Sequence, residues 1–407
     1  MFFVNFVFRK GVVMKKVVIT HAKRTPIGKF LGAFANTTAV DLGVVAVKGI
    51  LAESKLDPKL VEEVIIGNAR QAGNRPNPGR QVSYFSGIPQ ETPAYTVNKA
   101  CGSGLKSIVL AYQSIVLGDA DIIVAGGTEN MTRVPFMLEK ERVGYRLGNS
   151  KLLDGMYHDG LLCPLCNLIM GETAENLVAK YKITREEQDK FAMNSQHKCE
   201  QARKSNRFKE EIVPVMLKEK GKDVPFYTDE NPRDGVTLES LAKLQPVFKK
   251  DGGSVHPGNA CGIADSAAAV LIMSEDKAKE LGYKPMAYIT GYVSVGVDPA
   301  YMGIAPVPAI RKLEQKTGQK LNDFDLIELN EAFAAQVIAA DKELHLDMSK
   351  INVNGGAIAL GHPIGSTGCR IVVTLLHEMQ KRNAQKGLAT LCMSGGMGMA
   401  VSFLRAS

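Results

Sequence analysis

Three glycine-rich turns carry the side chains of this sequence that could do covalent chemistry. Cys101 lies between a short extended run and a long apolar helix pattern, with Gly102 and Gly104 beside it. The open N–H groups and the positive dipole end of a helix favour a thiolate at such a place. Far downstream, His362 and Cys392 each lie on a glycine-rich turn of their own. A thiol, an imidazole and a second thiol in these settings indicate carbon–carbon bond chemistry on an acyl thioester.

Each candidate also has a structural alternative. A free cysteine is usually a small buried hydrophobe, and a lone histidine is often structural. The helix-mouth position favours a nucleophile at Cys101, whose proton His362 could take. The same imidazole could instead donate a hydrogen bond to a thioester oxygen. Cys392 could act as a general base or acid near neutral pH. Asn330, at the end of a predicted strand, is either a helix N-cap or an amide that anchors a water.

The remaining cysteines give weaker signals. Seven scattered cysteines do not indicate a disulfide framework, and they fit a reducing compartment, so we expect a cytoplasmic protein. Cys163 and Cys166 form one CxxC pair near His158, which alone indicates zinc only weakly, and we predict no metal site. The sequence holds neither a Walker A loop nor a GxGxxG segment after a strand, so phosphate cradles of these kinds are not expected.

Composition narrows the class of partner. The chain has 407 residues, of which 45% are apolar, and a net charge of +8, which allows two or three domains around a large core. Basic residues are interleaved with acidic ones and aromatic residues are few, so an anionic small substrate is expected and nucleic acid is not. No later segment has the uncharged length of a membrane span. We interpret residues 1–13 as an over-extended start, with Met14 as the natural beginning.

An internal repeat predicts which elements position the candidate residues. The helix-period stretch that begins at Asp41 leads to a strand ending at Asn68, and residues 306–330 repeat this helix, turn and strand. Each copy continues with a glycine-rich turn, a helix and a continuously apolar strand, so that Cys101 matches His362. Strands buried on both faces and alternating with helices predict an α/β fold. Two such units packed face to face would bring the two turns together.

Between the copies lies a charged, irregular region. It contains two helix patterns, and the second begins with a capping box of Thr184 and Glu187. Such an excursion beside a catalytic turn is a substrate lid or an oligomer contact, and both can hold. The predicted domains are an N-terminal half (14–131), an inserted loop domain (132–262), a return to the N-terminal half (263–284) and a C-terminal half (285–407).

Four segments together resemble the signature blocks of the thiolase family, and specifically of its acetyl-CoA acetyltransferases. The segments are NKACGSGLKSI, NEAFA, GGAIALGHPIGSTG and CMSGGMG, and the similarity runs from about Lys15 to the C-terminus. The resemblance implies two related halves in five α/β/α/β/α layers with an inserted loop domain. It implies reversible Claisen condensation of two acetyl-CoA to acetoacetyl-CoA and CoA by a ping-pong mechanism through acetyl-Cys101. No cofactor is expected beyond the CoA thioester substrate, and the expected assembly is a homodimer or homotetramer without a membrane partner.

The family pattern also implies roles for single residues. Cys101 is the nucleophile, His362 activates it and helps polarise a thioester carbonyl, and Cys392 removes and later returns a proton. Asn330 holds a water that completes one oxyanion hole, and the backbone N–H groups of Cys101 and Ser394 form the other. The resemblance places coenzyme A along Arg233, Ser240, Phe248, Met170, Cys261, Met302, Ala332 and Phe333.

Three departures from the family pattern bear on substrate range. Short-chain members usually carry His where Ile169 stands and Ser where Cys261 stands, and both changes make the expected tunnel less polar. Ser394 replaces the first Gly of the usual C-x-Gly-Gly-Gly but still offers its N–H. A degradative 3-ketoacyl-CoA thiolase of broader chain length is the close alternative. A ketosynthase-like enzyme or a non-catalytic acyl-CoA-binding protein fits less well, because the second thiol, Cys392, is present and no candidate catalytic residue is lost.

Overall fold

The computed structural model describes residues 15–406, so the predicted extension 1–13 lies outside the described residues. Its largest feature is a ten-stranded mixed sheet in the order β14-β15-β16-β13-β1-β12-β5-β3-β4, with β2 paired to β12. In chain order these strands are β1 (Val17–Arg24), β2 (Gly28–Lys29), β3 (Glu63–Gly67), β4 (Ala94–Val97), β5 (Ile122–Asn130), β12 (Ala264–Ser274), β13 (Ala287–Gly296), β14 (Leu326–Leu329), β15 (Lys386–Met393) and β16 (Met397–Arg405).

The sheet is built from two copies of one pairing pattern. In the first copy, β3 pairs in parallel with β4 and β5, and β5, β12 and β1 follow in antiparallel order. In the second copy, β14 pairs in parallel with β15 and with Ile351, and β15, β16 and β13 follow in antiparallel order. Only Val18 and Ile19 of β1 pair with β13, so a short junction joins the copies. This arrangement confirms the predicted α/β fold of two related halves.

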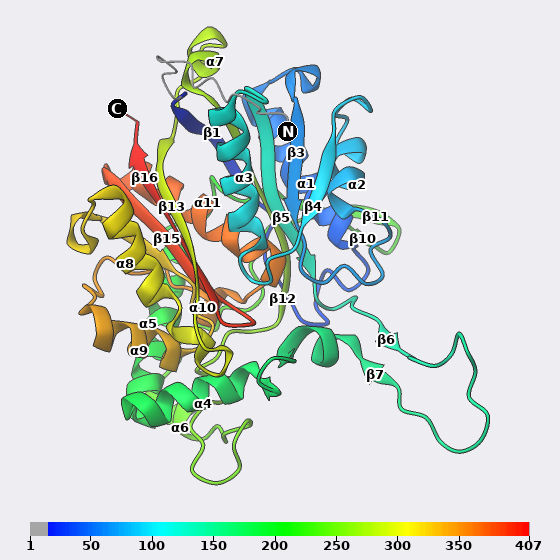
Figure 1. Ribbon diagram of the computed structural model, residues 1–407, viewed down its shortest axis with the longest axis vertical. Helices are drawn as coiled ribbons and strands as arrows, with labels where there is room; N and C mark the ends of the chain where they lie inside the picture. The colour runs from blue at the N-terminus through cyan, green and yellow to red at the C-terminus, as the bar shows by residue number, and fades with distance from the viewer. Residues whose placement is uncertain (1–14, 407) are drawn as a thin grey trace, which may run out of the picture.

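Helices complete five layers around the two halves. α3 (Ser103–Leu117) and α11 (Ile364–Arg382) pack against each other between the halves, in one apolar cluster with strands of both. α1 (Ala39–Ser54) and α2 (Pro78–Phe85) cover the outer face of the first half, and α8 (Pro306–Thr317) and α9 (Ala334–Leu344) cover that of the second (Figure 1). The strands β5 and β12, whose apolar runs predict burial on both faces, are therefore buried along their whole length.

The central helices approach closely because each carries a glycine near its N-terminus. A Cβ on Gly104 would lie 2.8 Å from the Cys369 backbone nitrogen, and one on Gly368 would lie 2.3 Å from that of Leu105. The stretch Ala100–Leu117, which includes α3, is long and apolar enough to cross a membrane by composition alone. In this fold it packs against α11 at the centre of the molecule. The two glycines thus let both helix N-termini lie side by side.

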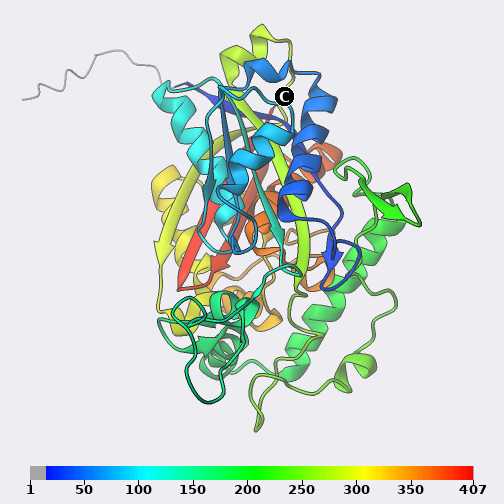
Figure 2. The same cartoon turned by 90° about the vertical axis from the view of Figure 1, so that its right-hand side faces the viewer.

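The inserted region leaves the sheet after β5 and returns at β12. It contains α4 (Met170–Tyr181), α5 (Arg185–Lys204), α6 (Leu238–Ala242) and several short strands. Much of it lies below the strand ends, whereas the hairpin of β10 (Val215–Glu219) and β11 (Lys222–Phe226) lies beside α1 (Figure 2). Thr184 and Glu187 form both hydrogen bonds of the predicted capping box at the start of α5. The buried Arg24 of β1 fixes the region to the first half through Glu211 and Asp229, at 2.6 and 2.7 Å.

Candidate active site

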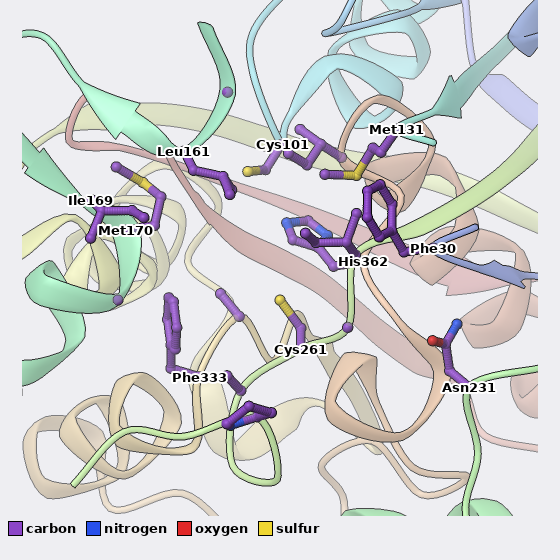
Figure 3. A pocket seen from close by; sticks show the side chains of 18 of the residues that line it. Phe30, Cys101, Met131, Leu161, Ile169, Met170, Asn231, Cys261, Phe333 and His362 are labelled. Carbon is purple, nitrogen blue, oxygen red and sulfur yellow. The ribbon is translucent and has the colours of Figure 1, made fainter. Parts of the chain in front are cut away.

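A cavity of about 620 Å³ lies where the two halves and the inserted region meet. Its wall includes most of the residues that the sequence singled out, namely Cys101, Met170, Arg233, Phe248, Cys261, Met302, Ala332, Phe333, His362, Cys392 and Ser394. Figure 3 shows Cys101 and His362 on one side of the cavity, Leu161, Ile169 and Met170 on another, and Cys261 with Phe333 across from Cys101. The predicted meeting of the glycine-rich turns is therefore present.

The Cys101 turn is held by a strained backbone. Ala100 has φ of 48°, in the left-handed region that a non-glycine residue enters at a cost. The Asn98 side chain accepts from the Ala100 N–H at 3.0 Å, and the Ser103 hydroxyl donates to the Ala100 carbonyl at 2.7 Å. These bonds fix the thiol directly before the first turn of α3, whose N-cap is Gly102.

Burial raises the pKa of Cys101, so the thiolate expected from the helix-mouth position is not the favoured resting form. Two backbone N–H groups, those of Ser394 and of Cys101 itself, act on this thiol and oppose the effect of burial, as does the positive charge of Arg70. The cavity is too desolvated for the helix dipole to prevail. A separate base is needed to remove the Cys101 proton.

His362 is placed as that base. Burial, and then the positive charges of Arg370 and Arg70, lower its pKa to about 3, so the imidazole is neutral at pH 7. Its Nδ1 lies 2.7 Å from Thr367 Oγ1, and that hydroxyl donates to the Pro363 carbonyl at 3.0 Å. With the single Thr367 hydrogen donated to Pro363, we assign the imidazole proton to Nδ1, which donates to the Thr367 oxygen. The unprotonated Nε2 is buried without a protein partner, beside a cavity that His362 itself lines.

Cys392 is the most deeply buried of the three cysteines that line the cavity. It lies on β15 and is buried, and burial followed by the neighbouring thiols of Cys101 and Cys261 raises its pKa. Burial raises the pKa of Cys261 to about 12, with Cys101 again as a neighbour. Cys392 is therefore a weak acid whose thiolate, once formed, is a strong base.

Asn330 follows β14 directly but is not a helix cap. Its N–H donates to the carbonyl of Thr390, two residues before Cys392 on the neighbouring strand, at 3.0 Å, and the residue is not part of the cavity lining. α9 begins four residues later with Phe333 as its N-cap, so the N-cap alternative for Asn330 is wrong. Both side-chain atoms of Asn330 are buried and have no protein partner among the described residues. Buried amides are almost always satisfied, which makes this amide a place for an ordered water.

The turn after Cys392 accommodates Ser394, which stands where the family pattern has glycine. Gly395 and Gly396 have φ of 83° and 76°, and a Cβ on Gly396 would lie 2.3 Å from the Val297 carbonyl oxygen. Ser394 is not among the residues with positive φ. The two positions that require glycine therefore keep it, and the Ser394 N–H remains directed at the Cys101 thiol.

Ser240 is not brought into this cavity. It lines a separate hollow of about 340 Å³ together with Arg233, Leu244 and Pro257. Its hydroxyl donates to the Thr237 carbonyl at 2.7 Å as part of the cap of α6, and the residue is exposed. Arg233 borders both hollows, so the two are neighbours.

Three supporting residues were not predicted from the sequence. Thr367 fixes the tautomer of His362, and Arg70 lines the cavity while donating to the Gly160 carbonyl at 2.6 Å. The buried Glu129 accepts from the N–H groups of Ala69 and Gly365, at 3.0 and 2.9 Å, and so ties the end of β3 to α11. Burial raises the pKa of Glu129 to about 6. The available signals were Arg70, shortly after the apolar strand β3, and Glu129, a charged residue near the end of the otherwise apolar strand β5.

Within residues 15–406, no group of three or more His, Cys, Asp or Glu residues is arranged to hold a metal ion. Near the CxxC pair, His158 binds Asp159 through Nδ1 at 2.7 Å. Cys163 and Cys166 are neighbours of each other, and burial followed by the Cys163 thiol raises the pKa of Cys166. The structure thus supplies no third ligand for the weak zinc hypothesis in this region.

Comparison with known proteins accounts for almost the whole chain. The N-terminal domain of thiolase matches residues 17–276, and the C-terminal domain of thiolase matches residues 283–405. An acetyl-CoA acetyltransferase of Pseudomonas aeruginosa is 52% identical over 393 residues, which cover 96% of this chain and 100% of that protein. A probable acetyl-CoA acyltransferase of Staphylococcus aureus is 51% identical over 388 residues, or 95% and 98% of the two chains.

Solved structures agree with this assignment. The acetyl-CoA acetyltransferase of Bacillus anthracis is 46% identical with a TM-score of 0.95, covering 97% of this chain and 100% of that one. Human mitochondrial 3-ketoacyl-CoA thiolase in complex with CoA is 44% identical with a TM-score of 0.93, covering 97% and 98%. With both domain matches, the repeated halves and the shared cavity in agreement, this chain belongs to the thiolase family.

Proposed function

We propose that this protein is an acetyl-CoA C-acetyltransferase, which condenses two acetyl-CoA to acetoacetyl-CoA and CoA and also runs the reverse thiolysis. The observation that carries the proposal is the meeting of Cys101, His362 and Cys392 at one cavity, although they come from three distant parts of the chain. Relatives named acetyl-CoA acetyltransferase at about half identity over nearly the full chain support it.

The first half-reaction acetylates Cys101. His362 Nε2 accepts the thiol proton as the sulfur attacks the acetyl carbonyl, because this nitrogen is unprotonated and unpartnered. The Cys101 and Ser394 N–H groups stabilise the tetrahedral oxyanion. The bond to the CoA sulfur breaks, and Cys392 donates its proton to that sulfur. Acetyl-Cys101, imidazolium and the Cys392 thiolate remain, and CoA leaves as the thiol.

The second half-reaction forms the carbon–carbon bond. The Cys392 thiolate removes a methyl proton from a second acetyl-CoA, and burial makes this thiolate a strong base. The enolate oxygen accepts from the His362 imidazolium and from a water on Asn330. The carbanion attacks the acetyl carbonyl, the thioester to Cys101 breaks, and the imidazolium returns its proton to that sulfur. Every protein group then has its starting proton, and acetoacetyl-CoA leaves.

The cavity also determines the acyl range that we propose. Ile169 and Cys261 both line the wall, where the family pattern has histidine and serine. A buried methylene gains about 0.8 kcal/mol when it is moved out of water, or about fourfold per carbon. We therefore infer that acetoacetyl-CoA is the main thiolysis substrate and that 3-ketohexanoyl-CoA is also turned over. A 3-ketoacyl-CoA thiolase of broader range is the second candidate function, and the apolar wall favours it.

Assembly and location complete the proposal. β4 is an end strand of the sheet, and the adjoining Tyr84, Phe85 and Tyr95 are exposed. An uncovered edge with exposed aromatic side chains suits a homodimer or homotetramer. Seven cysteines without a disulfide among those described suit a cytoplasmic enzyme that needs no cofactor beyond its CoA thioester. Light scattering on the purified full chain tests the assembly.

The roles of the two catalytic thiols are tested by separating acetylation from proton exchange. Cys392→Ala is expected to form acetyl-enzyme slowly but not to exchange the methyl protons of acetyl-CoA with deuterated water. His362→Ala is expected to slow acetylation itself. Cys199→Ala, a buried cysteine outside the cavity, is the matched control and should do both at the normal rate. Normal proton exchange in Cys392→Ala would contradict the assignment of the carbon base.

A further inference from the structure

The CxxC pair of the inserted region lies on a hairpin that the proposed reaction does not use. β8 (Leu162–Cys163) and β9 (Leu168–Ile169) pair in antiparallel order, and the turn between them carries Cys166. The Asn167 N–H donates to the Cys163 carbonyl at 2.8 Å, and Asn167 takes φ of 54° to close the turn. The hairpin is therefore tight and well defined.

This turn brings two thiols into bonding position. Cys163 and Cys166 stand three residues apart across the turn, and such residues have Cα atoms within about 7 Å, the range that a disulfide can bridge. Burial, and then the neighbouring Cys163 thiol, raise the pKa of Cys166, so the attack of this thiol is favoured by alkaline pH. Cys163 is fully buried, whereas Cys166 is half-buried and reachable from solvent. An accessible attacking thiol beside a buried resolving thiol is the arrangement that forms a disulfide reversibly.

The hairpin also contacts the catalytic cavity from both of its ends. Leu161 precedes β8 and Ile169 ends β9, and both side chains line the cavity wall (Figure 3). At the tip, the Leu165 Cδ1 lies 3.9 Å from the point that a Cβ on Gly395 would occupy. Gly395 belongs to the turn that directs the Ser394 N–H at the Cys101 thiol. A change in the hairpin therefore reaches the oxyanion-binding turn and the acyl wall together.

We propose that Cys163 and Cys166 form a reversible disulfide when a small-molecule disulfide is present, and that this oxidation lowers the activity. With a disulfide oxidant, the Cys166 thiolate attacks one sulfur and releases the first thiol. Cys163 then attacks the mixed disulfide and releases the second, so two protein thiols and one oxidant disulfide give one protein disulfide and two small thiols. Closing the bond to about 2.05 Å draws Cys166 inward and moves Leu165 against the Gly395 turn.

The modification is tested on the purified full chain with oxidised glutathione. Free thiols are then alkylated, and the masses of the non-reduced tryptic peptides are measured by mass spectrometry. The segment 152–180 has no internal lysine or arginine and contains only these two cysteines, and the segment 100–106 contains only Cys101. The expected result is a 152–180 peptide lighter by two hydrogens and without alkylation, which dithiothreitol restores to the dithiol. This part of the test does not depend on the proposed function.

The effect on activity rests on the proposed function and uses two variants. Cys166→Ser should keep the basal thiolysis rate and fail to form the light peptide, whereas Cys199→Ala should behave as the wild type. Displacement of a catalytic group by about 1 Å can cost about a hundredfold in rate. We therefore expect oxidation to reduce kcat/KM in the wild type about tenfold more than in Cys166→Ser, in which any loss comes from the cavity thiols alone.

Three results would overturn this proposal. The first is a 152–180 peptide that stays fully alkylated under conditions that modify Cys101. The second is equal loss of activity in the wild type and Cys166→Ser. The third is protection of both thiols from alkylation that a chelator removes, which would indicate a metal pair instead. Absence of thiolase activity together with a normal light peptide would refute the proposed function and leave the disulfide assignment standing.

Discussion

Thr367 offers the most specific test of how the site prepares its base. Its hydroxyl accepts from His362 Nδ1 at 2.7 Å and donates to the Pro363 carbonyl, which leaves Nε2 free to accept the Cys101 proton. Thr367→Val keeps nearly the same shape but removes the acceptor. A buried N–H without a partner costs about 1–3 kcal/mol, and the imidazole avoids this cost by moving its proton to Nε2.

In the variant, the reactive form with the proton on Nδ1 is therefore the less stable tautomer. Each turnover has to pay the free-energy difference between the two tautomers before Nε2 can accept the Cys101 proton. At 1.36 kcal/mol for each tenfold, a cost of about 1–3 kcal/mol slows acetylation about 5- to 150-fold. The assay mixes enzyme with acetyl-CoA, quenches at short times and measures acetyl on the 100–106 peptide. Thr367→Ser restores the hydroxyl and should acetylate within about twofold of the wild-type rate. Wild-type acetylation by a folded Thr367→Val would refute the assignment of the tautomer.

Three further predictions follow from the same geometry. Ile169→His should lower kcat/KM for 3-ketohexanoyl-CoA about fourfold relative to acetoacetyl-CoA, and an unchanged ratio would show that loop shape sets chain length. Gly365→Ala places a Cβ 2.7 Å from a Glu129 carboxylate oxygen and should cost about 1–3 kcal/mol in the free energy of unfolding, whereas Gly296→Ala, with its nearest atom at 3.9 Å, serves as the chemical-denaturation control. Alkylation of Cys101 by iodoacetamide should show no inflexion between about pH 5 and 7, because burial keeps the thiol protonated and His362, with a pKa of about 3, is neutral throughout; an inflexion near 6.5 would indicate a thiolate–imidazolium pair.

The sequence could predict the two repeated halves of the fold and the features that depend on residues close together in the chain. The apolar strands, the helix period and the matching turns of Cys101 and His362 predict two related halves, because each unit must bury both faces of its sheet. The capping box at Thr184 could also be predicted, because it depends only on two residues three positions apart. The glycines at 104 and 365 indicated the turns, but the sequence did not show that Gly104 and Gly368 allow the two central helices to touch.

What the sequence could not predict depends on burial and on partners far apart in the chain. The thiolate expected at Cys101 is disfavoured because the folded chain buries the helix mouth and desolvates the thiol. Ser240 matched a family position, yet its hydroxyl caps α6 in a neighbouring hollow. Glu129 supports the site through hydrogen bonds to Ala69 and Gly365, contacts that no local pattern shows.

The most direct test of the central claim is the position of the acyl group. The full chain is incubated with acetyl-CoA alone, digested without reduction and mapped by mass. Cys101 and Cys392 fall on different tryptic segments, 100–106 and 387–405, each with a single cysteine. We expect one acetyl group on the 100–106 peptide, lost again when CoA is added. Acetylation of the 387–405 peptide instead, or of neither, would contradict the assignment of Cys101 as the nucleophile.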